Sequence, residues 1–302
     1  MLKFSIIIAS YNEEKDIRAT LEGVLKLTYP NKEIIVVDDS TDRTPEIVKE
    51  YVGRGVKLLN GPRAGCCEAM NYAVEYATGD VFVAIDSDVV APPDFLEKLA
   101  KHYEAGADFV IINSKVPNME TVYARFAEFQ HQFLHKGRSD MYYSEGFSCR
   151  RELAIKVGVF DTGKFPVKFC RDWTLGKKML AANYKKVYDP SLFVYHKAPD
   201  NFGEYWIERK ERGRFSAFVQ YFFLHKPLLL LLFKFLAKDI KFLLRFVTIV
   251  LGFFYAFRLS RYSANRFKDL LPLWGLYFLQ ELGHVTGEWE GFRVALKHPK
   301  IN

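Results

Sequence analysis

Short apolar runs alternate with segments of helical periodicity along the first 200 or so residues of the chain. The runs at 4–9, 33–37, 56–59 and 81–85 are rich in isoleucine, valine and leucine, which is typical of strands buried in a sheet. This alternation predicts an α/β domain with a mostly parallel, Rossmann-like sheet that carries helices on both faces. Further strands are predicted at 108–112, 142–149 and 192–195, and further helices at 119–136, 170–182 and 204–215.

Two carboxylates follow the buried run at 81–85. Asp86 and Asp88 are two residues apart, so in an extended chain their side chains point to the same side. Open α/β sheets bind ligands at the carboxyl ends of their strands. Two hard oxygen donors at such a place suit Mg²⁺ or Mn²⁺ holding a phosphate-bearing substrate. A strand-end turn with two solvated aspartates is the alternative, and the tripeptide alone does not distinguish the two.

The composition separates the chain into a neutral part and a basic part. The net charge is +7, and residues 221–302 hold 12 basic and 5 acidic side chains, so the whole excess lies in this strongly apolar segment. Basic and apolar character together favour an anionic membrane surface over nucleic acid as a partner. The four cysteines lack C-x-x-C spacing, which argues against a zinc site and a disulfide framework and fits a reducing compartment.

Four strand-end motifs occur in order along the chain. They are Ser-Tyr-Asn-Glu at 10–13, Val-Asp-Asp-Ser-x-Asp at 37–42, Gly-Asp at 79–80 with Asp-Ser-Asp at 86–88, and Arg-Asp-Trp at 171–173. Together these motifs resemble those of the family 2 glycosyltransferases, which are inverting enzymes of the GT-A fold. The resemblance covers about the first 215 residues. It implies transfer of a sugar from a UDP- or GDP-sugar with Mg²⁺ or Mn²⁺ as cofactor.

On the donor side, the resemblance implies that Tyr11 packs on the nucleobase, with Ala9 and Ser10 lining the same loop. Asp39 matches the carboxylate that accepts a hydrogen bond from the base. Because an ionised carboxylate only accepts, both the imide of uracil and the N1/N2 edge of guanine fit it. A structural tyrosine at a strand end is the alternative for Tyr11, and Asp38 is predicted to orient the loop. The further donor-side residues are Glu13, Arg63, Asn71, Asp86 and Ser87.

For the metal, the resemblance implies that Asp88 is the direct ligand. The cation would bridge the diphosphate and neutralise the departing nucleoside diphosphate. His196 matches a late histidine that in some GT-A enzymes ligates the metal or contacts the diphosphate. A structural histidine at the end of a strand is the alternative.

On the acceptor side, Asp172 matches the catalytic base, the second acid of a Glu-Asp pair in that family. A positioned base contributes about 10²–10⁴-fold to the rate. Here Arg171 replaces the preceding Glu, which leaves the role of base open, because an arginine there could instead hold an anionic acceptor such as a lipid phosphate. A helix N-terminal acid without catalytic role is the alternative for Asp172. Gly146 and Trp173 are also expected near the substrate.

The segment 221–302 is predicted to be a helical, membrane-associating addition to a catalytic domain at 1–220. Lys234, Lys238, Lys241 and Arg245 are spaced 4, 3 and 4, so they share one helical face, with leucine, phenylalanine and isoleucine opposite. This pattern predicts an interfacial helix with its cations toward anionic lipid. An ordinary helical subdomain or a homo-oligomer interface is the alternative. A peripheral or monotopic protein at the cytoplasmic face of the cell membrane is expected, with a lipid or lipid-linked acceptor.

Two rival functions fit part of the pattern. Asp86-Ser87-Asp88-Val89 after an apolar strand also matches the nucleophile motif of haloacid-dehalogenase-like phosphatases, in which Asp86 would be phosphorylated. In that class the strand usually lies near the start of the domain, whereas here three βα units precede it. A non-catalytic, membrane-bound sugar-nucleotide binder is the second rival, and it predicts binding without turnover.

Overall fold

The computed structural model describes residues 1–134, 145–161, 171–247 and 249–298, except for the side chains at 171–172 and 245–247. The chain divides into two compact units. The sheet unit comprises Met1–Lys115, Arg138–Thr162 and Lys168–Lys197. The helical unit comprises Val116–Gly137, Gly163–Val167 and Ala198–Asn302.

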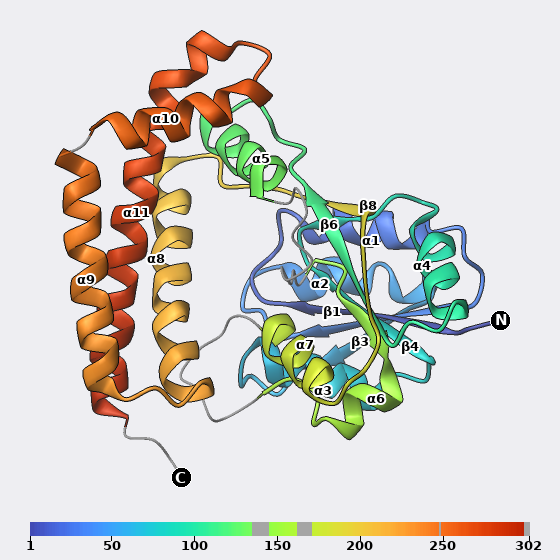
Figure 1. Ribbon diagram of the computed structural model, residues 1–302. Coiled ribbons are helices and arrows are strands. Elements are labelled where there is room, and N and C mark those ends of the chain that lie inside the picture. Colours follow the sequence, from blue (N-terminus) through green and yellow to red (C-terminus); the bar gives the residue numbers. More distant parts are fainter. Residues whose placement is uncertain (135–144, 162–170, 248, 299–302) are drawn as a thin grey trace. The chain divides into compact units, whose positions relative to one another are not determined.

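The described residues of the sheet unit form one eight-stranded sheet with the order β3-β2-β1-β4-β7-β6-β8-β5 (Figure 1). Strands β1 to β4 are parallel to one another, and β6 is parallel to β8. The short strands β7 and β5 run antiparallel to their neighbours, so the predicted mostly parallel sheet is confirmed. The strands are β1 (Phe4–Ser10), β2 (Lys32–Asp38), β3 (Val56–Asn60), β4 (Val81–Asp86), β5 (Val89–Val90), β6 (Phe109–Lys115), β7 (Ser148–Arg150) and β8 (Lys186–His196).

Helices cover both faces of this sheet (Figure 1). Alternate residues of β1 show the two layers, because Ile6 and Ile8 lie in one buried cluster and Ile7 lies in the other. The first cluster includes residues of α1 (Ile17–Leu25), α2 (Thr44–Lys49) and α4 (Phe95–Glu104). The second includes residues of α3 (Cys66–Tyr76), α6 (Arg151–Lys156) and α7 (Arg171–Ala181). A 3₁₀ turn, η1 (Val52–Arg54), precedes β3.

The strand register aligns the polar ends of three neighbouring strands. Ser10 of β1 pairs with Asp38 of β2, and Ala9 pairs with Asp86 of β4. Since these strands are parallel, their carboxyl ends lie at one edge of the sheet. The apolar stretches that precede these residues are fully buried. Because side chains alternate between the two faces, a shift of the strand register by one residue would turn every side chain to the opposite face.

The helical unit consists of long helices around two buried aromatic clusters. One cluster joins Phe126 and Phe129 to Tyr205 and Leu276, and the other surrounds Phe235. The elements are α5 (Val122–Leu134), α8 (Phe202–Phe218), η2 (Val219–Phe223), α9 (Leu228–Val247), α10 (Ile249–Leu259), η3 (Ser260–Tyr262) and α11 (Arg266–Lys297). The range 1–220 predicted for the catalytic domain therefore includes α5 and α8, which belong to the helical unit.

Helices α8 and α11 run side by side with their backbones close together (Figure 1). Gly283, Gly287 and Gly291 are spaced four residues apart on α11, so they lie on one face. A Cβ atom at Gly287 would overlap the carbonyl oxygen of Lys210, and one at Gly291 would lie 2.8 Å from Cβ of Ala217. The absence of side chains at these positions lets α11 approach α8.

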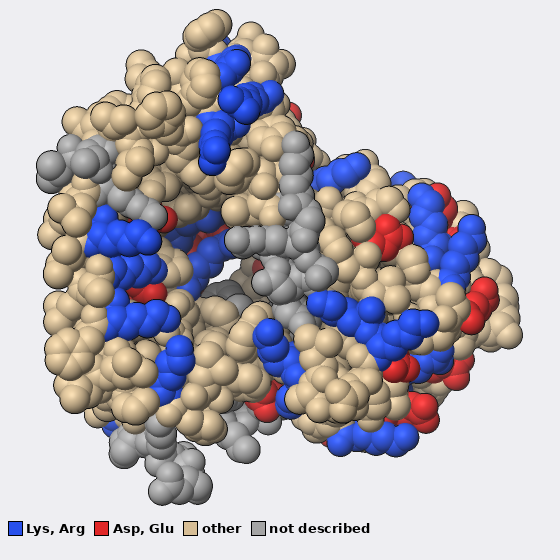
Figure 2. Space-filling view, in the orientation of Figure 1, with Lys and Arg blue, Asp and Glu red and all other residues tan. Residues whose placement is uncertain are grey.

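Of the four cations predicted to share one face of α9, Lys234 and Lys241 are exposed, Lys238 is partly buried, and the side chain of Arg245 lies outside the described residues. Nζ of Lys238 lies 2.9 Å from Oε2 of Glu288, a carboxylate buried in the helical unit, and Lys234 bonds to the side chain of Gln220. A buried carboxylate needs such a partner, which explains why Lys238 turns toward the protein, whereas Lys234 stays exposed. An apolar row of α9 is exposed as well, and Figure 2 shows uncharged surface beside the basic groups at the left of the molecule. Its members are Leu229, Leu230, Phe233, Leu236, Ile240, Leu243 and Leu244.

Hydropathy and length give one further result for this region. No single helix among the described residues is long and apolar enough to cross a membrane. The pair Leu228–Leu244 and Ile249–Tyr262, bent by 85° at the break between them, passes the same test of length and composition when the two helices are taken together.

We expect Gly287→Ala to lower the free energy of unfolding by about 1–3 kcal/mol, because the new methyl group forces α8 and α11 apart. Gly275→Ala is the matched control, since no atom lies within 4 Å of a Cβ at this exposed position of the same helix. It should be neutral or stabilising by up to about 1 kcal/mol. Urea unfolding of the full chain measures both variants, and equal effects would contradict the close packing.

Candidate active site

The acidic motif after β4 lies at the carboxyl edge of the sheet. Asp86 and Asp88 are partly exposed, whereas Ser87 between them is buried, although β4 ends at Asp86 and the next two residues form a turn rather than an extended segment. The carbonyl oxygen of Ser87 accepts a hydrogen bond of 2.8 Å from Oγ1 of Thr20 on α1. This bond ties the turn between β4 and β5 to the helix.

His196 ends β8 and faces this motif. Its partner in the antiparallel pairing of β5 and β8 is Val89, the residue directly after Asp88. Nε2 of His196 lies 3.1 Å from Oδ2 of Asp88, and Nδ1 lies 2.8 Å from Oε1 of Glu145. Both ring nitrogens therefore have a carboxylate partner, which fixes the orientation of the imidazole.

Glu145 was not identified from the sequence. Its side chain is only 13% exposed, and it stands directly before Gly146. Gly146 has a φ of +87°, a Cβ there would lie 2.5 Å from Cδ1 of Ile112, and its N–H donates to the carbonyl oxygen of Ala84 at 2.8 Å. The glycine thus seats this turn on the sheet and places Glu145 against His196. An acidic residue next to a glycine is only weak evidence for a functional residue. The strand predicted at 142–149 also left no turn at this position.

The two carboxylates govern the charge of His196. Burial opposes protonation of the ring, but Glu145 and Asp88 outweigh this effect, so the pKa of His196 lies well above its usual value. The carboxylates at this edge therefore favour a positive charge beside them, either the proton of His196 or a bound cation in its place. These carboxylates come from Glu13, Asp86, Asp88 and Glu145.

Glu13 lies beside the same motif. Burial and the negative charges of Asp88, Asp16 and Asp86 raise its pKa from 4.5 to about 7, although a hydrogen bond with Ser87 opposes the shift. The backbone N–H of Glu13 donates to Oγ1 of Thr44 at 2.8 Å, which ties this loop to α2. Like-charge repulsion of this kind marks a place where a cation is favoured.

A second group of predicted residues surrounds the end of β2. Oδ1 of Asp38 accepts from Oγ of Ser10 at 2.6 Å and from Oγ of Ser40 at 2.7 Å, so its carboxylate orients the loop. Oδ1 of Asp39 accepts from the backbone N–H of Arg63 at 3.0 Å. The side chain of Asp39 lies directly over Gly61, where a Cβ atom would overlap it.

Tyr11 follows β1 at this edge and is 57% exposed, so its ring is accessible. Trp173 lies in α7, and the ammonium of Lys177 stands 5.5 Å from its ring centre. The side chains of Arg171 and Asp172 lie outside the described part of the chain, although α7 begins at Arg171. Their predicted acceptor-side roles stay predictions.

Asn71 has a different set of contacts from the rest. Its Nδ2 donates to the carbonyl oxygen of Phe160 at 2.9 Å, and its Oδ1 accepts from the backbone N–H of Phe160 at 3.0 Å. Both ends of the amide are thus engaged in tying α3 to the segment after α6. These bonds give Asn71 a structural role, and its predicted contact with the donor stays a prediction.

The fit of a metal ion depends on Asp88 and His196. Among the described side chains, no group of three or more His, Cys, Asp or Glu residues is arranged to hold a metal. Oδ2 of Asp88 and Nε2 of His196 are 3.1 Å apart. A carboxylate oxygen and an imidazole nitrogen are both donors that Mn²⁺ accepts, so this pair would supply two ligands to a cation. Mg²⁺ commonly takes its remaining ligands from water and substrate phosphates.

Comparison with known sequences gives a family. The sequence model for glycosyl transferase family 2 matches residues 5–163. The poly-beta-1,6-N-acetyl-D-glucosamine synthase of Staphylococcus epidermidis is 27% identical over 223 residues, 68% of this chain and 52% of that protein. The hyaluronan synthase of Streptococcus pyogenes is 34% identical over 132 residues, 40% of this chain and 28% of that protein. The chain spans about half the length of the first relative and less of the second.

Comparison with solved structures gives the fold. The mannosyltransferase PcManGT from Pyrobaculum calidifontis in complex with GDP-Man and Mn²⁺ has a TM-score of 0.59 and 18% identity, covering 99% of this chain and 76% of that one. TarS 1–349 of S. aureus in complex with UDP-GlcNAc has a TM-score of 0.53 and 18% identity, covering 97% and 92%. These likenesses confirm the predicted GT-A fold. The family model matches residues 5–163, which are more than half of the 302 residues of this chain, and the chain therefore belongs to glycosyl transferase family 2.

Proposed function

We propose that the chain is an inverting, metal-dependent glycosyltransferase. It moves a sugar from a nucleoside diphosphate sugar to a lipid or lipid-linked glycan acceptor at a membrane surface. The observation that carries this proposal is the pairing of Asp88 with His196 at the carboxyl edge of the sheet. Family membership favours sugar transfer over the phosphatase reaction in which Asp86 would be the nucleophile.

Asp88 and His196 are the residues proposed to hold Mg²⁺ or Mn²⁺. One observation in support is their donor separation of 3.1 Å, and another is the collection of carboxylates around them. The chemistry that such a cation supplies when bound is Lewis-acid stabilisation of a departing diphosphate. Glu145 acts on His196 rather than on the cation, because its carboxylate holds Nδ1 and so presents Nε2 to the site.

Tyr11 and Asp39 are proposed to bind the nucleobase. Tyr11 offers an accessible ring for stacking, and Asp39 keeps Oδ2 clear of any hydrogen bond from the described residues while Oδ1 is held by the N–H of Arg63. A carboxylate fixed in this way can accept a hydrogen bond from an N–H of uracil or guanine. Both bases stay candidates, since the two solved neighbours were obtained with GDP-Man and UDP-GlcNAc.

The acceptor is proposed to approach the start of α7. Asp172 would remove the proton from an acceptor hydroxyl, which an inverting reaction needs on the face opposite the leaving group. An acceptor phosphate is already ionised and would be held by Arg171 instead. Two relatives carry the names of synthases of poly-beta-1,6-N-acetyl-D-glucosamine and hyaluronan, which keeps a growing glycan among the candidates.

Association with the cytoplasmic face of the cell membrane is proposed for the helical unit. The exposed apolar row of α9 continues on α10 with Ile249, Val250 and Leu251, each more than half exposed. Residues 221–302 also carry the entire positive excess of the chain. An apolar surface with basic residues suits the interface of an anionic leaflet, where each cation contributes about 1 kcal/mol.

We expect Asp88→Asn to abolish the Mn²⁺-dependent stabilisation of the chain by its nucleoside diphosphate sugar, because the variant lacks the anionic ligand. Thermal unfolding of the full chain with a panel of UDP- and GDP-sugars, with and without Mn²⁺, measures this effect. Asp94→Asn, which changes an exposed carboxylate paired with Lys98, should leave the stabilisation unchanged. Equal stabilisation of wild type and Asp88→Asn would overturn the metal assignment.

We expect Glu145→Gln to weaken Mn²⁺ binding by about 10–100-fold, because the neutral amide no longer supports His196 as a ligand. Titration of the protein with Mn²⁺ followed by electron paramagnetic resonance measures the affinity directly. Glu152→Gln, at an exposed position of α6, serves as the control of equal charge change. The order of affinity should be wild type, then Glu145→Gln, then Asp88→Asn, and unaltered affinity in Glu145→Gln would refute the positioning role.

A further inference from the structure

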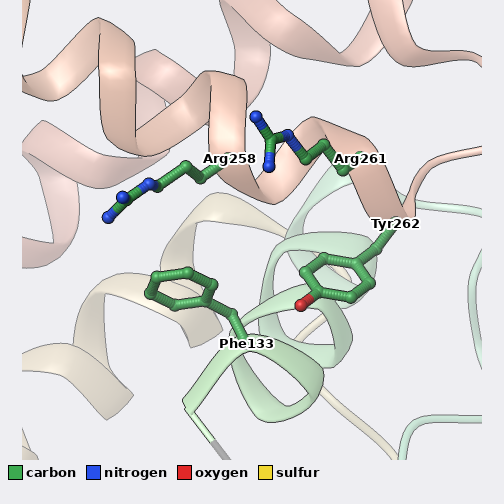
Figure 3. A pocket seen from close by; sticks show the side chains of 4 residues that line it. All are labelled: Phe133, Arg258, Arg261 and Tyr262. Carbon is green, nitrogen blue, oxygen red and sulfur yellow. The ribbon is translucent and has the colours of Figure 1, made fainter. Parts of the chain in front are cut away.

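The helical unit contains an open cavity of about 460 Å³ (Figure 3). It is lined by Arg258 at the end of α10, Arg261 and Tyr262 of η3, and Phe133 near the end of α5. Figure 3 shows the two arginines on one side of the cavity and the two aromatic rings on the other. The lining therefore combines two permanent cations with apolar ring faces.

The arginines have no acidic partner among the described residues. Neither Arg258 nor Arg261 has a hydrogen bond or ion pair there, and the guanidinium of Arg261 only stands 5.8 Å from the ring of Phe257. The neighbouring carboxylate of Asp269 does not compensate them, because it is already bound by Arg125 at 2.8 and 3.0 Å. Two guanidinium groups that line one cavity and have no acidic partner in the described ranges favour an anion.

The helix that carries Arg258 also supplies an apolar path to the cavity. Val250, Phe254 and Arg258 are four residues apart, so they form one stripe along α10. Val250 and Phe254 are each 59% exposed. The stripe thus begins with apolar side chains and ends with a cation. An amphiphile with an anionic head and an apolar tail matches this order, whereas a soluble anion would contact only the cationic end of the stripe.

We propose that this cavity binds the terminal phosphate of a membrane lipid, with the lipid chain lying along α10. The proposal rests on the membrane association inferred above and names the lipid group that it recognises. A terminal phosphate has three acceptor oxygens and up to two charges, which two planar guanidinium groups can bind through several N–H donors. A phosphodiester headgroup offers one charge and fewer free oxygens. The rings of Phe133 and Tyr262 enclose the opposite side of the phosphate.

Vesicle flotation of the full chain tests the proposal. One set of phosphatidylcholine vesicles contains phosphatidic acid, and the other contains phosphatidylglycerol at matched surface potential. We expect wild type to prefer phosphatidic acid by about tenfold, and Arg258→Gln/Arg261→Gln to bind both sets equally. The ratio of binding to the two vesicle sets cancels the contribution of general attraction between cations and anionic lipid. A wild-type ratio near one, or a ratio that survives in the double variant, would overturn the proposal.

Arg293→Gln/Lys297→Gln is the matched control. It removes two exposed cations from α11 in the same unit, so it should weaken binding to both vesicle sets and keep the tenfold preference. Arg258→Lys/Arg261→Lys keeps the charge but not the planar donors, so its preference should be intermediate. Loss of the preference in the Arg293→Gln/Lys297→Gln control would show general electrostatics and would count against a built site.

Thermal unfolding separates a lipid from a free phosphate. Dihexanoyl phosphatidic acid, used as a monomeric lipid, should raise the unfolding temperature of wild type more than inorganic phosphate at the same concentration. Equal shifts would assign the cavity to a soluble phosphate and reject the lipid. Stabilisation by a nucleoside diphosphate sugar with Mn²⁺ should be the same in Arg258→Gln/Arg261→Gln as in wild type. The donor site and the phosphate cavity can therefore fail independently.

Discussion

The imidazole of His196 depends on two carboxylates that come from distant parts of the chain. Asp88 follows β4, and Glu145 precedes β7, so the ring is oriented only when β5 pairs with β8 and the turn at Gly146 lies on the sheet. Because each ring nitrogen has one partner, loss of either carboxylate would let the ring rotate. The geometry of the candidate metal site is therefore a consequence of sheet pairing as much as of its own residues.

The parts of this arrangement that follow from local periodicity could be predicted from the sequence. Alternation along an extended chain predicts a shared direction of Asp86 and Asp88, and in the structure a buried Ser87 lies between the two partly exposed aspartates, although Ser87 and Asp88 form a turn. The alternation of apolar runs with amphipathic segments likewise predicts a mostly parallel sheet. The strand-end motifs, taken in order, also indicated the family. Their side chains lie at one edge of the sheet because parallel strands bring their carboxyl ends together there.

Which side chains contact one another could not be predicted from the sequence in the same way. The position of Glu145 depends on the turn at Gly146, which packs against Ile112. Nothing in the local sequence indicates this packing contact. The lysines of α9 were expected to face lipid, yet Lys238 pairs with buried Glu288, because a carboxylate inside the protein needs a cation. Asn71 is engaged by Phe160, which lies 89 residues away in the chain. Such choices are made by tertiary packing, which periodicity does not encode.

The glycines of α11 also bear on how this helix finds its alignment with α8. Gly283, Gly287 and Gly291 repeat almost once per turn, so sliding α11 along its axis by one turn, about 5.4 Å, would present nearly the same smooth surface. The facing side of α8 is less regular, because a Cβ at Gly213 would overlap the carbonyl oxygen of His284, so steric fit favours the observed register. Nη2 of Arg214 lies 2.5 Å from Oε2 of Glu290, and a slip of one turn would separate this pair. The glycines of α11 permit the contact, and Gly213 together with this charge pair favours one alignment.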